Sequence, residues 1–158
     1  MLIDYQNLSN EAKVFLYPSS RKFYDNEVEE IRLKIKDMIS EWLDFSLAFK
    51  IEYNRFLLFF ISEESIVTTE FLDKLAHFIL QLEKEYSVVL LDKVNVCFKQ
   101  GEYVQYQEMK RFRELIKKKS ISKKTIIFNN LIRTKYEFEN EWEVSLSESW
   151  LSYLITGR

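Results

Sequence analysis

The spacing of apolar residues changes several times between the start of the chain and Phe98, and each change marks a predicted element. Apolar residues recur at helical spacing over Val28–Trp42 and Phe71–Leu82, and in strand patterns over Val14–Tyr17, Leu47–Tyr53, Phe56–Ile61 and Val94–Phe98. Phe56–Ile61 is apolar at every position, so we expect a central strand covered on both faces. This order of elements predicts an α+β fold of ferredoxin-like (βαββαβ) order, with two helices on one face of an antiparallel sheet.

Beyond Phe98 the pattern predicts an extension made of a hairpin, a helix and a strand. The turn is expected at Lys99–Glu102, the return strand from Tyr103, the helix from Gln107 to about Lys118, and the strand at Thr125–Phe128. An aromatic C-terminal tail follows, with a short helix after Ser147. We treat residues 1–158 as a single α+β domain. A subdivision into a split βαβ part, 12–92, and an extension, 93–158, is the alternative.

Two adjacent amides, Asn129 and Asn130, follow the last predicted strand, and aromatic residues then alternate with glutamates. Asparagine side chains both donate and accept hydrogen bonds, so this pair can bond the chain where it leaves the sheet. Phe138, Trp142 and Trp150 recur at even intervals. We therefore expect an ordered segment docked on the core, with Phe138 and Trp142 largely buried and any binding site on its polar edge.

Composition argues against nucleotide hydrolysis of the ATP-binding-cassette type and against metal or disulfide sites. The glycines are Gly101 and Gly157, and no phosphate-binding loop of the type used by ATP-binding-cassette proteins is present. One histidine, His77, and one cysteine, Cys97, provide neither a disulfide nor a zinc site, so we expect no metal and no cofactor. Cys97 lies on the more polar face of its predicted strand. No secretory signal or membrane-spanning stretch is apparent, which predicts a cytoplasmic protein without a membrane partner.

A basic cluster occupies residues 110–124, with eight positive charges against one glutamate. The whole chain carries a net charge of −2, so this window of about +7 leaves about −9 elsewhere. The candidate anion-binding residues are Lys117, Lys118, Lys119, Lys123 and Lys124. The cluster can either face the glutamate-rich tail or bind the phosphates of RNA, and the sequence leaves both alternatives open.

Several short motifs stand out along the chain: Tyr53-Asn54-Arg55-Phe56, Ile127-Phe128-Asn129-Asn130, Glu137-Phe138, Trp142-Glu143 and Glu148-Ser149-Trp150. From about Ala12 to Leu151 the chain resembles, through these motifs, a bacterial family of small proteins that are commonly labelled "ABC transporter ATPase". The missing phosphate-binding loop argues against the label. Many members carry Gly-Cys-Ser-Ile-Asp at the start of the second helix, where this chain has Thr69-Glu70-Phe71-Leu72-Asp73. The resemblance therefore implies no activity that needs that cysteine.

Residues 94–142 have the order strand, glycine turn, return strand, helix and Ile-Ser-x-x-Thr-Ile-Ile-Phe, with a later tryptophan. In this order they are similar to bacterial GYF-type domains, which bind proline-rich or extended peptides. The Gly-Pro-aromatic signature is missing, because Glu102 follows Gly101. This similarity supports the architecture more than the binding function.

These observations favour a non-enzymatic protein-interaction or adaptor module, with a surface around Asn129, Asn130, Trp142 and Trp150. The first alternative is an RNA- or ribosome-associated factor that uses the basic cluster. The second is an enzyme of unrecognised class, whose candidate polar site comprises Asn54, Arg55, Asp73, Asn129, Asn130 and Glu148. That hypothesis requires the fold to bring these residues together. A protein partner is expected, and the oligomeric state is not predicted.

Overall fold

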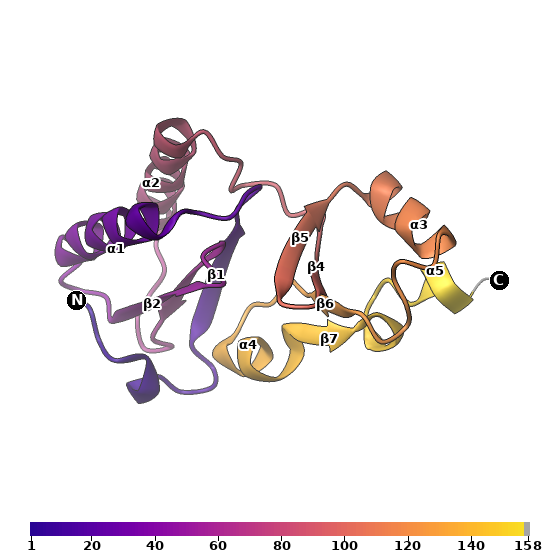
Figure 1. Ribbon diagram of the computed structural model, residues 1–158. Helices are drawn as coiled ribbons and strands as arrows, with labels where there is room; N and C mark the ends of the chain where they lie inside the picture. Colours follow the sequence, from indigo (N-terminus) through magenta and orange to yellow (C-terminus); the bar gives the residue numbers. More distant parts are fainter. Residues whose placement is uncertain (157–158) are drawn as a thin grey trace.

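The apolar strand β3 (Phe56–Ile61) lies at the centre of the first of two antiparallel sheets. The structure, a computed structural model, describes residues 1–156 (Figure 1). β3 pairs with β1 (Lys13–Pro18) on one side and with β2 (Leu47–Glu52) on the other. In this register Phe59 lies opposite both Phe15 and Phe49. Every residue of β3 is buried, as the unbroken apolar pattern predicts.

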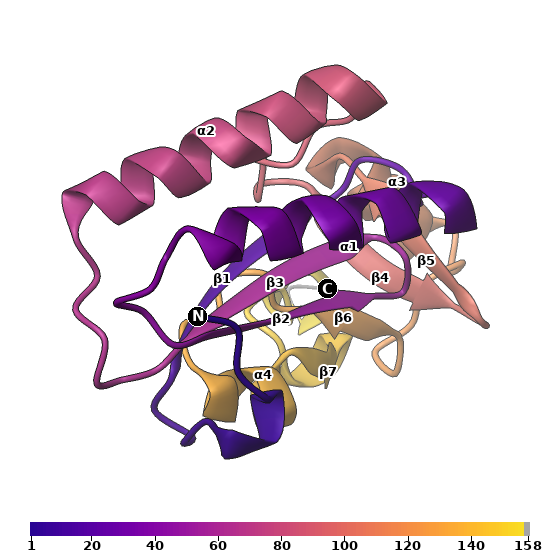
Figure 2. The ribbon, with the colours of Figure 1, turned by 90° about the vertical axis from the view of Figure 1, so that its left-hand side faces the viewer.

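Two long helices, α1 (Asp25–Ser40) and α2 (Thr69–Tyr86), cover one face of this sheet (Figure 2). α1 begins where the Glu27 carboxylate accepts a hydrogen bond from the backbone N–H of Tyr24. α2 begins at Thr68, whose hydroxyl accepts a hydrogen bond from the N–H of Phe71. The apolar stripes of the helices pack on the sheet through Val28, Ile31, Ile35 and Ile39 of α1, and Phe71, Leu75, Ile79, Leu82 and Tyr86 of α2.

The second sheet has the order β5-β4-β6-β7. Its strands are β4 (Val96–Gln100), β5 (Tyr103–Gln107), β6 (Ile126–Phe128) and β7 (Glu143–Ser145). The helices α3 (Met109–Lys117) and α5 (Tyr153–Thr156) belong to this half of the molecule (Figure 1). A separate apolar cluster joins them to the sheet, made of Val96, Phe98, Phe112, Ile116, Ile121, Ile127, Leu146 and Leu151.

The ferredoxin-like arrangement is formed only in part. β1, β3 and β2 are placed as that fold requires, but β4 pairs with β5 and β6 in the second sheet instead of lying beside β1. The outer edge of β1 is bonded by a later segment, where the N–H of Val14 donates to the carbonyl of Arg133. β4 finds a hairpin partner close in sequence, and it buries one face in the second half and the other against the first sheet, which explains the different pairing.

A third apolar cluster lies between the two sheets and holds them together. The first sheet contributes Val14, Leu16, Ala48, Phe56, Leu58 and Phe60, and the facing half contributes Cys97, Phe128, Ile132 and Trp142. Trp142 is 3% exposed, with its ring 4.9 Å from the rings of Phe56 and Phe128. The expected burial is confirmed for Trp142, and Phe138 is partly buried against the same cluster.

The aromatic tail differs locally from the alternating pattern that the sequence suggested. Residues Lys135–Glu141 form a helix, α4, with Thr134 as its cap, so Phe138 and Trp142 share a face through their spacing of four. Two 3-10 turns, η1 (Tyr5–Asn7) and η2 (Leu146–Glu148), complete the described elements. The buried Lys135 ammonium donates to the carbonyls of Leu8 and Tyr5, at 2.7 and 3.2 Å, and so fastens the N-terminal segment to α4.

We predict that Trp142→Ala lowers the free energy of unfolding by about 3–5 kcal/mol, because it empties the centre of the cluster between the sheets. Trp150→Ala is the matched control, since Trp150 is 47% exposed. It should cost about 1 kcal/mol or less. Urea denaturation of both variants measures the difference. Equal losses would show that Trp142 does not hold the two halves together.

Candidate functional site

The structure does not bring the six candidate polar residues together. Asn54 and Arg55 line one pocket beside the turn between β2 and β3, and Asn130 lines a different one. Asp73 is exposed on α2, and Glu148 is exposed in η2. α2 and the C-terminal segment lie at opposite ends of the molecule (Figure 1). The set therefore offers no common constellation for an enzyme.

Asn129 and Asn130, the two amides that follow β6, form hydrogen bonds within the protein where the chain leaves the sheet. The side-chain carbonyl of Asn129 accepts a hydrogen bond from the N–H of Leu131 at 3.1 Å, which shapes the turn. The buried Asn130 accepts from the indole N–H of Trp142 at 3.3 Å and donates to the Cys97 sulfur at 3.4 Å. These contacts satisfy the polar atoms inside the cluster between the sheets. Asn130 and Trp142 are thus not accessible to a partner protein.

Cys97 is 1% exposed. It is therefore buried, although the sequence places it on the more polar face of its strand. Its face of β4 packs on the first sheet, which the strand pattern alone could not reveal. Burial raises the pKa of the Cys97 thiol to about 11, although the hydrogen bond from Asn130 and the nearby Arg55 act in the opposite direction. The thiol is therefore protonated at neutral pH and is a poor nucleophile.

Trp150, which the sequence analysis placed on a candidate interaction surface, is 47% exposed. Together with Val94 and Leu131, which are 78% and 63% exposed, it surrounds a small cavity of about 40 Å³. Apolar side chains gathered in this way can contact a partner. The cavity is too small to hold more than a single side chain.

The five candidate lysines, Lys117, Lys118, Lys119, Lys123 and Lys124, are all exposed after the end of α3 or at its last turn. Within residues 1–156 none of them forms an ion pair with the glutamates of the tail. Those glutamates have other partners: Glu143 pairs with Lys99, and Glu139 accepts a hydrogen bond from Tyr5. The structure thus leaves the basic cluster open to solvent.

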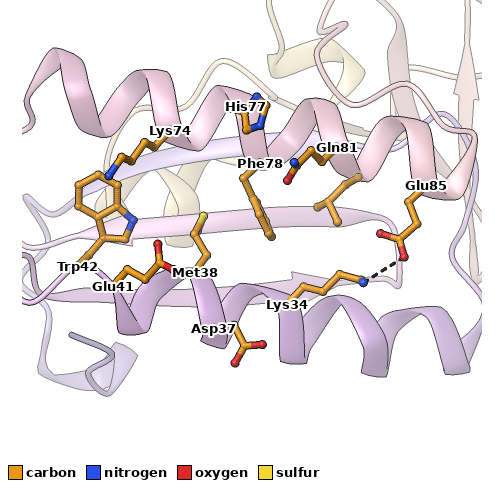
Figure 3. A pocket seen from close by; sticks show the side chains of 11 residues that line it. Lys34, Asp37, Met38, Glu41, Trp42, Lys74, His77, Phe78, Gln81 and Glu85 are labelled. Atoms are coloured by element: carbon orange, nitrogen blue, oxygen red, sulfur yellow. Dashed lines mark ion pairs between the residues drawn. The ribbon is translucent and has the colours of Figure 1, made fainter.

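The sequence analysis missed a pocket of about 530 Å³ between α1 and α2. Figure 3 shows Met38, Trp42 and Phe78 between the two helices, with the ion pair of Lys34 and Glu85 at one end. These three apolar side chains are partly buried against the core below them. The residues at the edge of each helix's apolar stripe could have indicated this pocket. Where a stripe is wider than its contact with the sheet, apolar side chains remain at the groove between the helices.

A second pocket, of about 570 Å³, continues this groove toward the loops at residues 41–45 and 64–68. Both pockets share Glu41, Trp42 and Lys74. Leu43 and Ile66 line the second pocket and are 81% and 80% exposed. We call the two pockets together the acidic groove, because carboxylates surround them: Asp37, Glu41, Asp44, Glu64, Glu70 and Glu85.

The lysines of the acidic groove have their charges engaged already. Lys34 pairs with Glu85 at 3.0 Å, and Lys74 pairs with Glu70 at 3.5 Å. Lys74 also lies over the ring of Trp42, 5.0 Å from its centroid. In contrast, no ion pair within the described part of the chain engages Asp37, Glu41 or Glu64. The groove therefore presents an apolar floor under an excess of negative charge.

Comparisons with protein-family models, with curated proteins and with solved structures find no match to this chain. The resemblances noted from the sequence therefore stay hypotheses. Among residues 1–156, no helix has the length and apolar character needed to cross a bilayer. The same residues contain no group of three or more histidine, cysteine, aspartate or glutamate side chains suited to a metal ion.

The raised pKa of Cys97 leads to a prediction about stability at alkaline pH. A folded-state pKa of about 11, against an ordinary value of 9.0, means that the unfolded thiol loses its proton first as the pH rises. The stability that the buried thiol contributes is present below pH 9 and lost between about pH 9 and 11. Urea denaturation should show a steeper loss over this range for the parent protein than for Cys97→Ala. Parallel losses would contradict the assignment.

Proposed function

We propose that this protein is a non-enzymatic interaction module whose acidic groove binds an apolar, positively charged segment of a partner protein. The observation that carries the proposal is the position of Leu43 and Ile66. Both side chains are about four-fifths exposed, and both line the pocket that continues the groove between α1 and α2. Large apolar side chains gathered around a concave surface are characteristic of interaction sites.

The shape of the acidic groove supports a helical or extended segment as its occupant. An amphipathic helix can lay its apolar face into a groove between two helices, with anchoring side chains spaced three and four residues apart. Trp42 lies where the two pockets meet and contacts both. Tryptophan is among the residues most enriched at the energetic centres of interfaces, so we assign Trp42 as the central contact.

The charge of the groove supports a basic partner. Asp37, Glu41 and Glu64 have no ion-pair partner in the described chain, so a cationic segment would gain favourable interactions with them. A groove of one sign also steers oppositely charged molecules toward it and disfavours acidic ones. The partner chemistry is therefore a segment that alternates leucine-like residues with lysine or arginine.

We predict that a synthetic peptide with leucines on one helical face and lysines on the other binds the protein, as measured by calorimetry. The double variant Leu43→Ser/Ile66→Ser should weaken this binding by about tenfold or more, because it removes apolar contacts without changing the charge of the groove. The same peptide with glutamates in place of lysines should bind more weakly still. Added salt should reduce the affinity for the lysine peptide.

Leu33→Ser serves as the control for the groove variant. Leu33 is 63% exposed on α1 and does not line the acidic groove, so its replacement should leave peptide affinity unchanged. Equal binding of the lysine and glutamate peptides would contradict the charge argument. Full affinity of the double variant would show that the peptide binds elsewhere.

A second candidate function, binding of RNA, is supported by the exposed basic cluster at the other end of the molecule. The five lysines are solvent-accessible and unengaged by the tail within residues 1–156. Phosphate contacts of this kind release counterions, so the affinity would depend strongly on salt. The protein would then be an RNA- or ribosome-associated factor.

For this candidate we predict a retardation of RNA at low salt that disappears when Lys117, Lys118, Lys119, Lys123 and Lys124 are replaced by glutamate. Replacement of Lys36 and Lys84, which are also exposed but lie on α1 and α2, is the matched control and should leave the retardation largely intact. The affinity should fall steeply between low and physiological salt. No retardation of the parent protein at low salt would remove this candidate.

A further inference from the structure

Arg55 is a buried cation without a carboxylate partner. Its side chain is 9% exposed, and one guanidinium nitrogen donates a hydrogen bond to the carbonyl of Ser19 at 3.1 Å. Within residues 1–156 no ion pair engages it. Buried arginine is normally paired with a carboxylate or with another anion, because the loss of hydration otherwise costs free energy. Arg55 therefore carries a buried positive charge that no carboxylate neutralises within residues 1–156.

The turn before Arg55 is held firmly in place. Tyr53 and Asn54 both have positive φ, 56° and 51°, as the two central residues of a type I′ turn do, and this is uncommon for residues other than glycine. Two contacts hold this conformation: the N–H of Phe23 donates to the carbonyl of Asn54 at 2.7 Å, and the Asn54 amide donates to Asp25 at 2.9 Å. Arg55 is thus positioned by the backbone on one side and by Ser19 on the other.

Arg55 lines a pocket of about 520 Å³ at the junction between the two halves of the molecule. One wall is the turn between β2 and β3 with Lys22, and the other is the hairpin of β4 and β5. We call this space the Arg55 pocket; the residues used below are Lys22, Tyr53, Arg55, Glu102 and Tyr103. Its volume lies in the range of small-molecule sites, which often form at such junctions.

The groups around Arg55 do not provide the missing charge. Its electrostatic neighbours are Cys97 and Tyr106. Burial raises the pKa of both, so neither is ionised at neutral pH. Two carboxylates that bond the neighbouring turn residues are engaged there: Asp25 by Asn54, and Glu143 by Tyr53 and Lys99. Glu102 lines the pocket but is exposed at the tip of the hairpin.

We infer that the Arg55 pocket binds a small organic anion through its carboxylate or phosphate group. Arg55 offers a planar set of donors that matches an oxyanion, and Lys22, which lines the same pocket, adds a second cation. The exposed rings of Tyr53 and Tyr103 line the same space and provide surfaces for the organic part of the ligand. Glu102 opposes the anion and weakens its binding.

Phenyl phosphate and benzoate are suitable probes, because each joins an oxyanion to a ring. We expect saturable binding of at least one of them by calorimetry, and the stronger of the two identifies the head group. Benzamide, which has the ring without the charge, should not bind. Arg55→Met should lower the affinity by about tenfold or more, whereas Arg55→Lys should keep part of it.

Two exposed positions provide a test that does not depend on folding of the Arg55 variants. Lys22→Gln should weaken binding of the probe, and Glu102→Gln should strengthen it, each by about threefold, as expected for partly screened charges. Lys36→Gln, on the outer surface of α1, should change nothing. A purely structural role for Arg55 predicts no response to either exposed substitution. Absence of saturable binding of both probes at millimolar concentration would overturn the inference, and so would unchanged affinity in both Lys22→Gln and Glu102→Gln.

Discussion

The rest of the structure depends on the burial of both faces of β3. A strand that is apolar at all six positions cannot leave either face in water, so the first sheet needs a cover on each side. α1 and α2 cover one face, and the second half of the chain covers the other through Phe128 and Trp142. The second sheet is therefore not an independent appendage. It completes the core of the first.

Polar groups that this arrangement buries are paired within it. Asn130 links the Trp142 indole to the Cys97 thiol, and Lys135 bonds two carbonyls of the N-terminal segment. Such bonds matter more for specificity than for net stability, because an unpaired polar atom in the cluster would be costly. Arg55, at the edge of the same junction, is paired less fully: within residues 1–156 its guanidinium makes one hydrogen bond, to the Ser19 carbonyl, whereas the Lys135 ammonium makes two. The burial of Arg55 without a carboxylate partner is better explained by a bound ligand than by packing.

The arrangement also separates charge along the molecule. The acidic groove belongs to α1, α2 and the loops beside them, whereas the basic cluster follows α3 at the opposite end (Figure 1). The same separation is present in the sequence as a window of about +7 in a chain of −2. Because the ends are far apart, the two charged surfaces can serve different partners without competing for space. The proposed groove and the exposed lysines are therefore compatible functions of one chain.

The sequence by itself determined the elements whose patterns are local: the burial of β3, the helical stripes of α1 and α2, the hairpin at Gly101, and the burial of Trp142. It could not decide which sheet β4 would join, because strand pairing depends on which edges are free and on what covers each face. For the same reason the polar face of β4 was misjudged, and Cys97 lies in the core. The acidic groove and the Arg55 pocket were also beyond a local pattern. Each is lined by segments far apart in sequence, and only the packing of helices and sheets brings those segments within reach of one another.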